Sequence, residues 1–395
     1  MPSFKGILYC GLLLVSSLLG SIFILLPFVP FVYLAPKLWR FYADFFVGYW
    51  LTLPAALCNF LFGIKFFVSG DQIECDKPAL IIMNHRTRLD WLFFWNALYA
   101  MDYRLLRSQK ISLKARLKLI PGAGWAMCCG AYLFLERNFE NDQHIMRRMI
   151  SYYKRSERNY QILLFPEGTD RGARAVFLSD VFAEKSGLPK YEYVIHPRTA
   201  GFTYLLQLMR EDGYIKHIYD VTVGYPKGVV SNEMDLVRRG RYPEEVHFNV
   251  RKYDINEIPA DAGMAAEWLN KIWLEKEERL KRFYTKNEEF QSPTDKRHMW
   301  TVGAFDMGYC CSIVFWVISS CFWCYLMVKV HLMRFYFILA CAFYVFCQKR
   351  FGGFENFADH MMKSRYERYG QHCQPESMNA DKHQQNHPHT HATQA

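Results

Sequence analysis

The sequence predicts an α/β domain held between two pairs of membrane-spanning segments. Both ends of the 395-residue chain carry long apolar runs without charges, which is typical of helices that cross a bilayer. Between them, short β-rich apolar runs alternate with longer amphipathic runs, the pattern of an α/β fold. Polar clusters follow several of the short runs, and ligands of open α/β sheets bind at the carboxyl ends of strands.

The composition is shifted toward membrane proteins, without the extreme apolarity of a many-helix transporter. Hydrophobic residues make up 51% of the chain, aromatic residues 17% and charged residues 22%. The net charge of +10 favours anionic lipid surfaces or polyanionic ligands without choosing between them. Six of the twelve cysteines lie in apolar runs, so we predict no disulfide framework. Cys321 and Cys324 lack the second pair of a zinc site, and we predict no metal centre.

The first pair of apolar runs predicts an N-terminal membrane hairpin over residues 1–68. Ile7 to Leu26 is twenty residues without a charge, and no cleavage signal accompanies it, so we interpret it as a retained anchor. Phe45 to Ile64 is a second run of twenty, with Pro54 inside, so it spans with a kink or is re-entrant. Lys37 and Arg40 fall in the loop between the two runs.

The second pair predicts a C-terminal hairpin over residues 301–350. Met307 to Val328 is twenty-two residues without a charge, whereas the run from Phe335 to Cys347 is thirteen residues and is short for a span. Residues 351–395 form a polar, His-rich tail that we expect to be disordered. Metal binding is a minor alternative for four of its histidines: His383, His387, His389 and His391.

The predicted catalytic domain covers residues 69–300. We expect strands at Ala79–Met83, Tyr132–Leu135, Gln161–Phe165, Tyr193–Ile195, Ile218–Val223 and Val246–Val250. We expect helices at Trp91–Met101, Ile145–Ser156, Thr203–Glu211 and Met264–Tyr284.

His85 and Asp90 are the strongest candidates for chemistry. They lie on a strand-to-helix turn, and five positions apart on one helix would separate them by about 140°, so they meet only across that turn. A carboxylate against one ring nitrogen would fix the tautomer and leave the other to take a proton from an alcohol. The alternative is a capping box, in which Thr87 caps the helix and Asp90 reaches back.

A second candidate is the turn from Phe165 to Arg171, which holds Glu167, Gly168 and Thr169 at a strand end. Gly168 permits close backbone approach to a ligand, and Glu167 is suited to a polar headgroup. Such a sequence is also common in ordinary turns.

Arg137 and Arg198 each follow a predicted strand, where a guanidinium group suits bidentate capture of phosphate. Because strand ends meet at one edge of a sheet, we predict that these arginines and both polar turns converge on one crevice.

These residues carry a specific resemblance. His85 and Asp90 match the His-x4-Asp motif of the glycerophospholipid acyltransferase family, and residues 165–169 read F-P-E-G-T, another of its motifs. Residues 132–137 and 194–197 are similar to the remaining two motifs, in the family's order. Residues 84–88, 121–127 and 182–199 resemble the subgroup of lysocardiolipin and 1-acylglycerol-3-phosphate acyltransferases.

The resemblance implies a mixed sheet flanked by helices and transfer of an acyl group from acyl-CoA, as co-substrate, to a lysophospholipid. No cofactor, metal or nucleic acid is implied. The acceptor would be lysocardiolipin, lysophosphatidylinositol or lysophosphatidic acid. The implied catalytic residues are His85 and Asp90, and the implied substrate-binding residues are Arg137, Glu167, Gly168, Thr169 and Arg198.

The same resemblance implies an integral protein of the endoplasmic reticulum whose catalytic domain faces the cytosol, because acyl-CoA is a cytosolic donor. One departure stands out: residues 171–180 replace the polar linker usual in the subgroup, which affects the expected headgroup contacts.

Three alternatives remain open at this stage. The dyad also suits a CoA-independent transacylase or another glycerol-based acceptor, and an inactive acyltransferase-like domain would only bind or shape lipid. A run of basic residues suits anionic lipid, CoA phosphates or an ordinary solvated helix face: Arg104, Arg107, Lys110, Lys114, Arg116 and Lys118.

Overall fold

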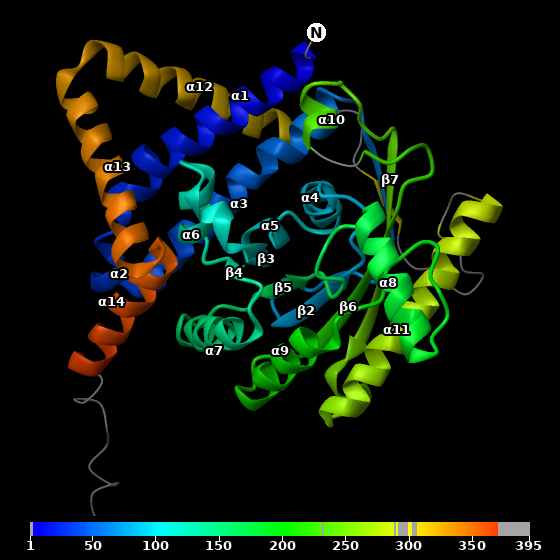
Figure 1. The fold of residues 1–395 in the computed structure, drawn as a ribbon. Helices are drawn as coiled ribbons and strands as arrows, with labels where there is room; N and C mark the ends of the chain where they lie inside the picture. The colour runs from blue at the N-terminus through cyan, green and yellow to red at the C-terminus, as the bar shows by residue number, and fades with distance from the viewer. Residues whose placement is uncertain (1–2, 231–232, 288–289, 291–298, 302–305, 370–395) are drawn as a thin grey trace, which may run out of the picture.

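The computed structural model describes residues 3–230, 233–287, 290, 299–301 and 306–369 (Figure 1). Within these residues, eight strands form one sheet in the order β4-β3-β5-β2-β6-β7-β1-β8. The pairs β6/β7 and β1/β8 are antiparallel and the others are parallel, so the predicted mixed sheet is confirmed. The strands are β1 (Lys65–Gly70), β2 (Ala79–Met83), β3 (Gln109–Lys114), β4 (Leu133–Leu135), β5 (Gln161–Leu164), β6 (His217–Gly224), β7 (Glu245–Asp254) and β8 (Met299–Thr301).

Helices cover both faces of this sheet, which is why the central strand β2 is buried along its whole length. Its side chains alternate: Leu80 and Ile82 pack toward α7, α9 and α11, while Ile81 and Met83 pack toward α3, α4 and α5. The helices of the domain are α4 (Asp90–Met101), α5 (Leu105–Ser108), α6 (Ala123–Cys129), α7 (Phe139–Arg155), α8 (Ala173–Ser186), α9 (Thr199–Glu211), α10 (Glu233–Val237) and α11 (Ala262–Arg282).

One expected strand is wrong. Residues 193–195 do not join the sheet, because the Glu277 carboxylate on α11 accepts the backbone N–H groups of Tyr193 and Val194 at 2.9 and 3.0 Å. A side chain therefore satisfies the donors that a neighbouring strand would otherwise take. The sequence prediction also missed β1, β3, β8 and helix α8.

Within the part of the chain that the structure describes, four helical segments are long and apolar enough to cross a membrane. At the N-terminus these are Phe4–Phe28, which comprises α1 (Phe4–Leu19), a π-helical turn (Gly20–Leu25) and a 3-10 turn (Leu26–Phe28), and α3 (Pro36–Phe60). A short α2 (Phe31–Leu34) connects them. At the C-terminus they are α12 (Met307–Lys329) and α13 (His331–Phe351).

The connection between the two N-terminal helical segments lies close to the catalytic domain. Lys37, at the start of α3, lies 2.6 Å from Glu157 beyond α7, while the other end of α3 leads directly into β1. Arg40 is buried and ion-paired with Asp44, so it is not a loop charge. Both ends of α3 therefore lie against the α/β domain.

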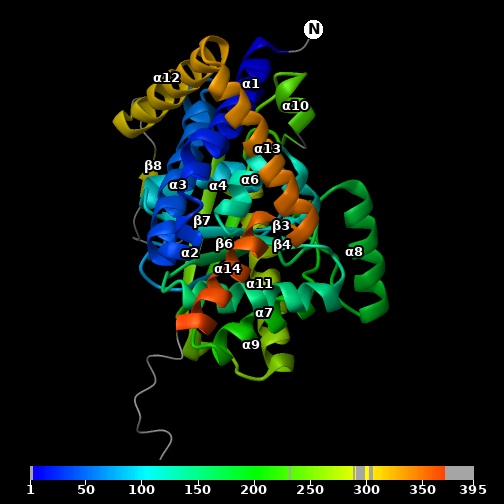
Figure 2. The same cartoon turned by 90° about the vertical axis from the view of Figure 1, so that its left-hand side faces the viewer.

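The two C-terminal apolar helices, α12 and α13, do not pack along each other. From Val330, α12 and α13 diverge as a V (Figures 1 and 2). Both helices carry many exposed apolar side chains. The expected disordered tail begins instead with helix α14 (Phe354–Tyr369), which is a correction for those residues. Glu355 of α14 forms an ion pair with Lys118, and Asp359 forms one with Arg155. Residues 370–395, with the four tail histidines, lie outside the described residues.

The basic run between Arg104 and Lys118 is not one surface, so neither a single lipid- or CoA-binding face nor a single solvated helix face describes it. Lys110 is buried and lies 2.8 Å from Asp44, and Lys118 is buried against α14. Burial lowers the pKa of Lys110 to about 8. Of this run, Lys114 lies at the carboxyl end of β3, near the candidate site.

Candidate active site

His85 and Asp90 meet across the turn between β2 and α4. His85 Nδ1 lies 2.9 Å from Asp90 Oδ2, which confirms that the two side chains are paired. The His85 side chain is 16% exposed and Asp90 is fully buried, so the imidazole is accessible and its carboxylate partner is not. With Nδ1 occupied, Nε2 is the nitrogen available to a substrate hydroxyl.

The reach-back hydrogen bond of the capping alternative and the dyad are both present and share one oxygen, although α4 has Leu89 and not Thr87 as its N-cap. Asp90 Oδ2 also accepts the Thr87 N–H at 2.9 Å, as the reach-back half of a capping box would. The Thr87 hydroxyl oxygen accepts the Leu89 N–H at 2.9 Å, so the turn is closed locally. The Thr87 backbone N–H therefore helps to fix the carboxylate in position for the imidazole.

Tyr225 is a third member of this cluster that the sequence analysis missed. Its phenol, fully buried, donates a hydrogen bond to Asp90 Oδ1, and burial raises the pKa of the phenol well above its usual value. Tyr225 directly follows β6, so it is also a polar residue at a strand end. Asn84 joins the ends of β2 and β6, because its amide bonds both the C=O and N–H of Val223, at 3.2 and 2.9 Å.

Glu167 is buried behind the histidine and does not line an exposed headgroup site. Its two carboxylate oxygens accept the backbone N–H of His85 and the indole N–H of Trp273, each at 3.2 Å. The Phe165 ring stacks on the imidazole at 4.2 Å between centroids. Burial raises the pKa of Glu167 to about 7. In this structure the Glu167 carboxylate holds the His85 turn, and its predicted contact with the substrate stays a prediction.

Gly168 lies between the two predicted phosphate-binding arginines. Arg137 Nη2 donates to the Gly168 C=O at 3.2 Å, and the Arg198 N–H donates to the Pro166 C=O at 2.8 Å. A Cβ on Gly168, whose φ is +73°, would lie 3.3 Å from Cδ of Arg198. The predicted convergence is therefore confirmed for these residues. Thr169 is beside them, half-buried, 3.5 Å from the Asp170 carboxylate.

Further cations surround this loop. Arg88 lies 3.6 Å from Asp170, and the side chain of Arg88 is 57% exposed. Burial and the positive charges of Arg137 and Arg88 lower the pKa of Lys114, which places these three cations near one another. The loop beside His85 is therefore rich in positive charge, which suits recognition of a phosphate.

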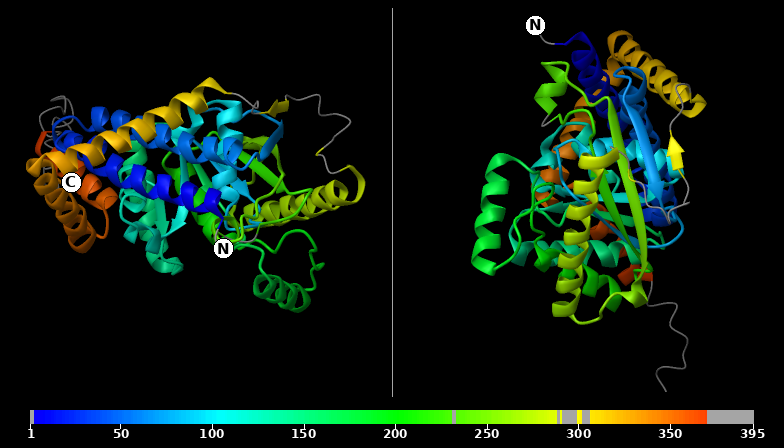
Figure 3. Two further views of the ribbon diagram at one scale, coloured as in Figure 1. Left: turned by 90° about the horizontal axis from the view of Figure 1, so that it is seen from above. Right: turned by 90° about the vertical axis from the view of Figure 1, so that its right-hand side faces the viewer.

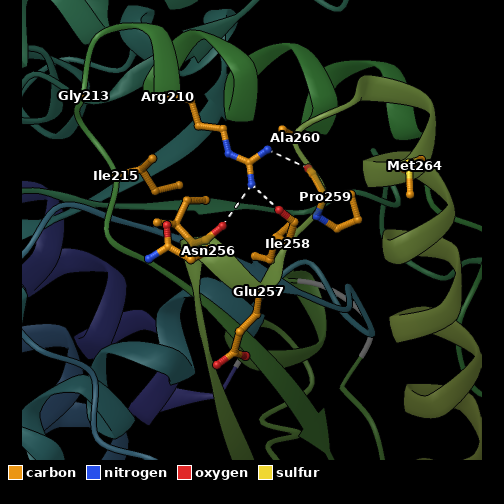
Figure 4. Close-up of a pocket in the computed structure, with 10 residues that line it drawn as sticks. Arg210, Gly213, Ile215, Asn256, Glu257, Ile258, Pro259, Ala260 and Met264 are labelled. Atoms are coloured by element: carbon orange, nitrogen blue, oxygen red, sulfur yellow. Dashed lines mark hydrogen bonds between the residues drawn. The ribbon is translucent and has the colours of Figure 1, made fainter.

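A cavity of about 620 Å³ lies elsewhere, beside the connection that precedes β6 (Figure 4). Because β6 runs parallel to β2, this cavity is at the opposite edge of the sheet from His85. The Arg210 guanidinium donates to the carbonyls of Ile255, Ile258 and Pro259 at 3.0, 2.7 and 2.6 Å. These hydrogen bonds give Arg210 a structural role in the wall of the cavity.

Comparison with known proteins agrees with this geometry. A family model described as "Acyltransferase" matches residues 65–225, and one described as "Acyltransferase C-terminus" matches residues 237–305. Lysocardiolipin acyltransferase 1 of Gallus gallus is 40% identical over 361 residues, which cover 90% of this chain and 94% of that protein. Lysophosphatidylinositol acyltransferase 10 of Caenorhabditis elegans is 39% identical over 366 residues, which cover 88% and 91% of the two chains.

A solved structure, the 1-acyl-sn-glycerophosphate (LPA) acyltransferase PlsC of Thermotoga maritima, aligns with a TM-score of 0.42 and 14% identity over 72% of this chain and 100% of that one. From the family match and the two close relatives, this chain is an enzyme that belongs to the acyltransferase family.

Proposed function

We propose that this enzyme transfers a fatty acyl group from acyl-CoA to the free hydroxyl of a lysophospholipid, with His85 as general base. The observation that carries the proposal is the buried Asp90 carboxylate 2.9 Å from His85 Nδ1, beside an electropositive loop. This arrangement supplies a base for an alcohol and cations for a phosphate. Among the described residues, the His85 ring pairs with Asp90 and stacks on Phe165 and has no hydrogen bond to a side-chain nucleophile, so direct transfer is the simpler route.

In the proposed reaction, His85 Nε2 takes the proton of the acceptor hydroxyl as its oxygen attacks the thioester carbonyl. The C–S bond then breaks, and the departing CoA thiolate receives the proton from the imidazolium. Asp90 keeps the imidazole oriented and stabilises its positive charge. General-base assistance contributes about 10²–10⁴-fold, and positioning contributes the rest.

Arg137 and Arg198 would hold the acceptor phosphate on either side of Gly168, supported by Lys114 and Arg88. Arginine suits this because its planar donors match phosphate oxygens bidentately. The names of the two close relatives favour lysocardiolipin or lysophosphatidylinositol as acceptor, and lysophosphatidic acid is a third candidate from the sequence motifs. We place the enzyme in the endoplasmic reticulum membrane, with this crevice facing the cytosol that supplies acyl-CoA.

The test is an assay of the purified full chain with radiolabelled acyl-CoA and a panel of lysophospholipids. We expect His85→Ala to lose at least about a hundredfold in kcat. The control is His144→Ala, an exposed histidine of α7 that should leave the rate unchanged. Near-normal transfer by folded His85→Ala would reject the mechanism. Transfer from a diacyl phospholipid without acyl-CoA would reject the proposed donor and indicate a transacylase.

Asp90→Asn separates the two roles of this side chain. Asparagine keeps an oxygen that can accept the Thr87 N–H but lacks the negative charge that stabilises an imidazolium. We expect a folded protein with strongly reduced kcat. An Asn variant with full turnover would show that Asp90 acts as a cap alone.

A further inference from the structure

Helix α8 stands away from the rest of the catalytic domain (Figures 2 and 3). Of its fourteen residues, which the structure describes in full, Ala183 alone is buried. The helix begins two residues after the polar turn at Glu167–Arg171, and it includes most of the segment in which this chain departs from the subgroup pattern. It therefore connects directly to the site while having little contact of its own.

The outward face of α8 is apolar and exposed. Phe177, Leu178 and Phe182 are 65%, 53% and 50% exposed. Leu178 and Phe182 are four residues apart and share one face, and Phe177 lies about 100° from Leu178 around the helix. Arg174 lies one turn before Phe177, and Lys185 lies one turn after the Phe177–Phe182 segment, so exposed cations bracket the apolar stripe.

Helix α8 is held by His196, whose ring contacts the partly exposed Phe182 at 5.6 Å between centroids and also meets Ser179. The Ser179 hydroxyl and the His196 ring Nδ1 are 2.8 Å apart, and the His196 N–H donates to the same hydroxyl at 3.0 Å. Just before the helix, the Arg171 N–H donates to the His85 C=O at 2.8 Å. A surface that bound the apolar face of α8 would consequently be held in a fixed position relative to the His85 turn.

We propose that α8 docks on the membrane surface from which the acceptor lipid is taken. Its three exposed apolar side chains enter the headgroup–acyl boundary, and Arg174 and Lys185 contact anionic headgroups. An apolar stripe bracketed by cations is the composition of helices that lie in a bilayer interface, and two large aromatic side chains exposed on a projecting helix are unusual on a surface that faces water alone.

A lipid occupant is favoured over a protein because α1, α12 and α13 already expose apolar surfaces suited to a bilayer. The inference rests on the proposed function only for the statement that the acceptor is a lipid. Docking through α8 would present the crevice between His85 and Arg137 to the surface that holds that lipid.

The direct test uses the full chain reconstituted in vesicles of phosphatidylcholine and phosphatidylserine. A photoreactive benzoylphenylalanine replaces Leu178 in one variant and Met264 in a matched control. Met264 is equally exposed, at 57%, but lines the cavity at the opposite edge of the sheet. We expect phospholipid adducts, read by peptide mass, at position 178 and not at position 264. Absence of lipid adducts at 178, or adducts with a second copy of the chain, would overturn docking. This readout does not depend on turnover.

The charged residues are tested by Arg174→Glu/Lys185→Glu. Each basic residue near an anionic surface is worth about fivefold in affinity, so we expect the apparent KM for lysolipid in these vesicles to rise at least tenfold. In detergent micelles the rate should stay unchanged. Lys216→Glu/Lys271→Glu, two exposed lysines away from α8, is the control and should retain the wild-type KM. A rate lost equally in micelles, or unchanged in vesicles, would contradict the proposal.

Discussion

Glu167 makes a prediction about the pH dependence of stability. Burial raises the pKa of this carboxyl from its ordinary 4.5 to about 7, although two N–H donors favour the ionised form. The folded state therefore binds the proton more tightly than the unfolded state. Its stabilising contribution is complete below pH 4.5 and is lost as the pH rises to about 7. At about 1.4 kcal/mol for each pH unit, the loss is about 3 kcal/mol.

Glu167→Gln removes this titration, so the melting temperature of the variant relative to wild type should rise between about pH 5 and pH 8. With roughly 2 °C for each kcal/mol in a chain of this size, the change in that difference is about 6 °C. The assay is thermal unfolding of both proteins in one detergent across this pH range. The amide group of Gln replaces one carboxylate oxygen with a donor that faces an N–H, which lowers the melting temperature at every pH. The measured quantity is therefore how the difference in melting temperature changes with pH, and not its absolute value.

Glu211→Gln is the control, because its side chain is 65% exposed and should give a difference that does not depend on pH. Parallel curves for Glu167→Gln and wild type would refute the reasoning, since they would mean that the buried carboxyl titrates near its ordinary pKa.

Three further variants test the contacts of the site and of α3. Tyr225→Phe removes the donor to Asp90, which is worth about 1.5–3 kcal/mol for a charged partner; we expect lower kcat at nearly unchanged KM, and a KM effect alone would contradict it. Asp44→Asn leaves buried Lys110 without its carboxylate partner, which lowers the free energy of unfolding by about 3–5 kcal/mol. The melting temperature should therefore fall, while turnover per folded molecule is retained. Gly168→Ala costs about 1–2 kcal/mol of backbone strain at φ +73° and brings a methyl group close to the side chain of Arg198. We expect the KM for phosphorylated acceptors to rise. Wild-type kinetics would show that this turn does not shape the site.

The sequence predicted the parts of the site that lie at strand ends. His85, Arg137 and Gly168 follow apolar β runs, and parallel strands bring such positions to one edge of a sheet, so their convergence followed from local patterns and topology rules. The pairing of His85 with Asp90 could also be predicted from the sequence, because residues five positions apart meet across a turn and not on one helix.

The rest depended on distant partners that leave no local signal. Tyr225 is 135 residues from Asp90, and Trp273 is 106 residues from Glu167, so neither contact could be read from spacing. For the same reason, the contact of Glu167 with the backbone of the His85 turn was not predicted. Strand β3 was missed because its Lys110 appeared to be a surface charge, and its buried partner is in a different helix.

That partner also bears on how the membrane segments relate to catalysis. Asp44 of α3 accepts hydrogen bonds from Lys110 on β3 at 2.8 Å and from the Tyr160 phenol, just before β5, at 2.6 Å. Strands β3 and β5 lead to Lys114 and to the turn that contains Glu167, so α3 is fastened to the two strands that present these residues. A buried charge cluster gives little net stability. It disfavours any other position of α3, because moving the helix would leave buried charges without their partners. We infer that α3 sets the position of the catalytic sheet relative to the bilayer instead of acting as a loose tether. Replacing α3 with an unrelated apolar helix should therefore abolish folding, whereas an enzyme that was merely tethered would remain folded and active in detergent.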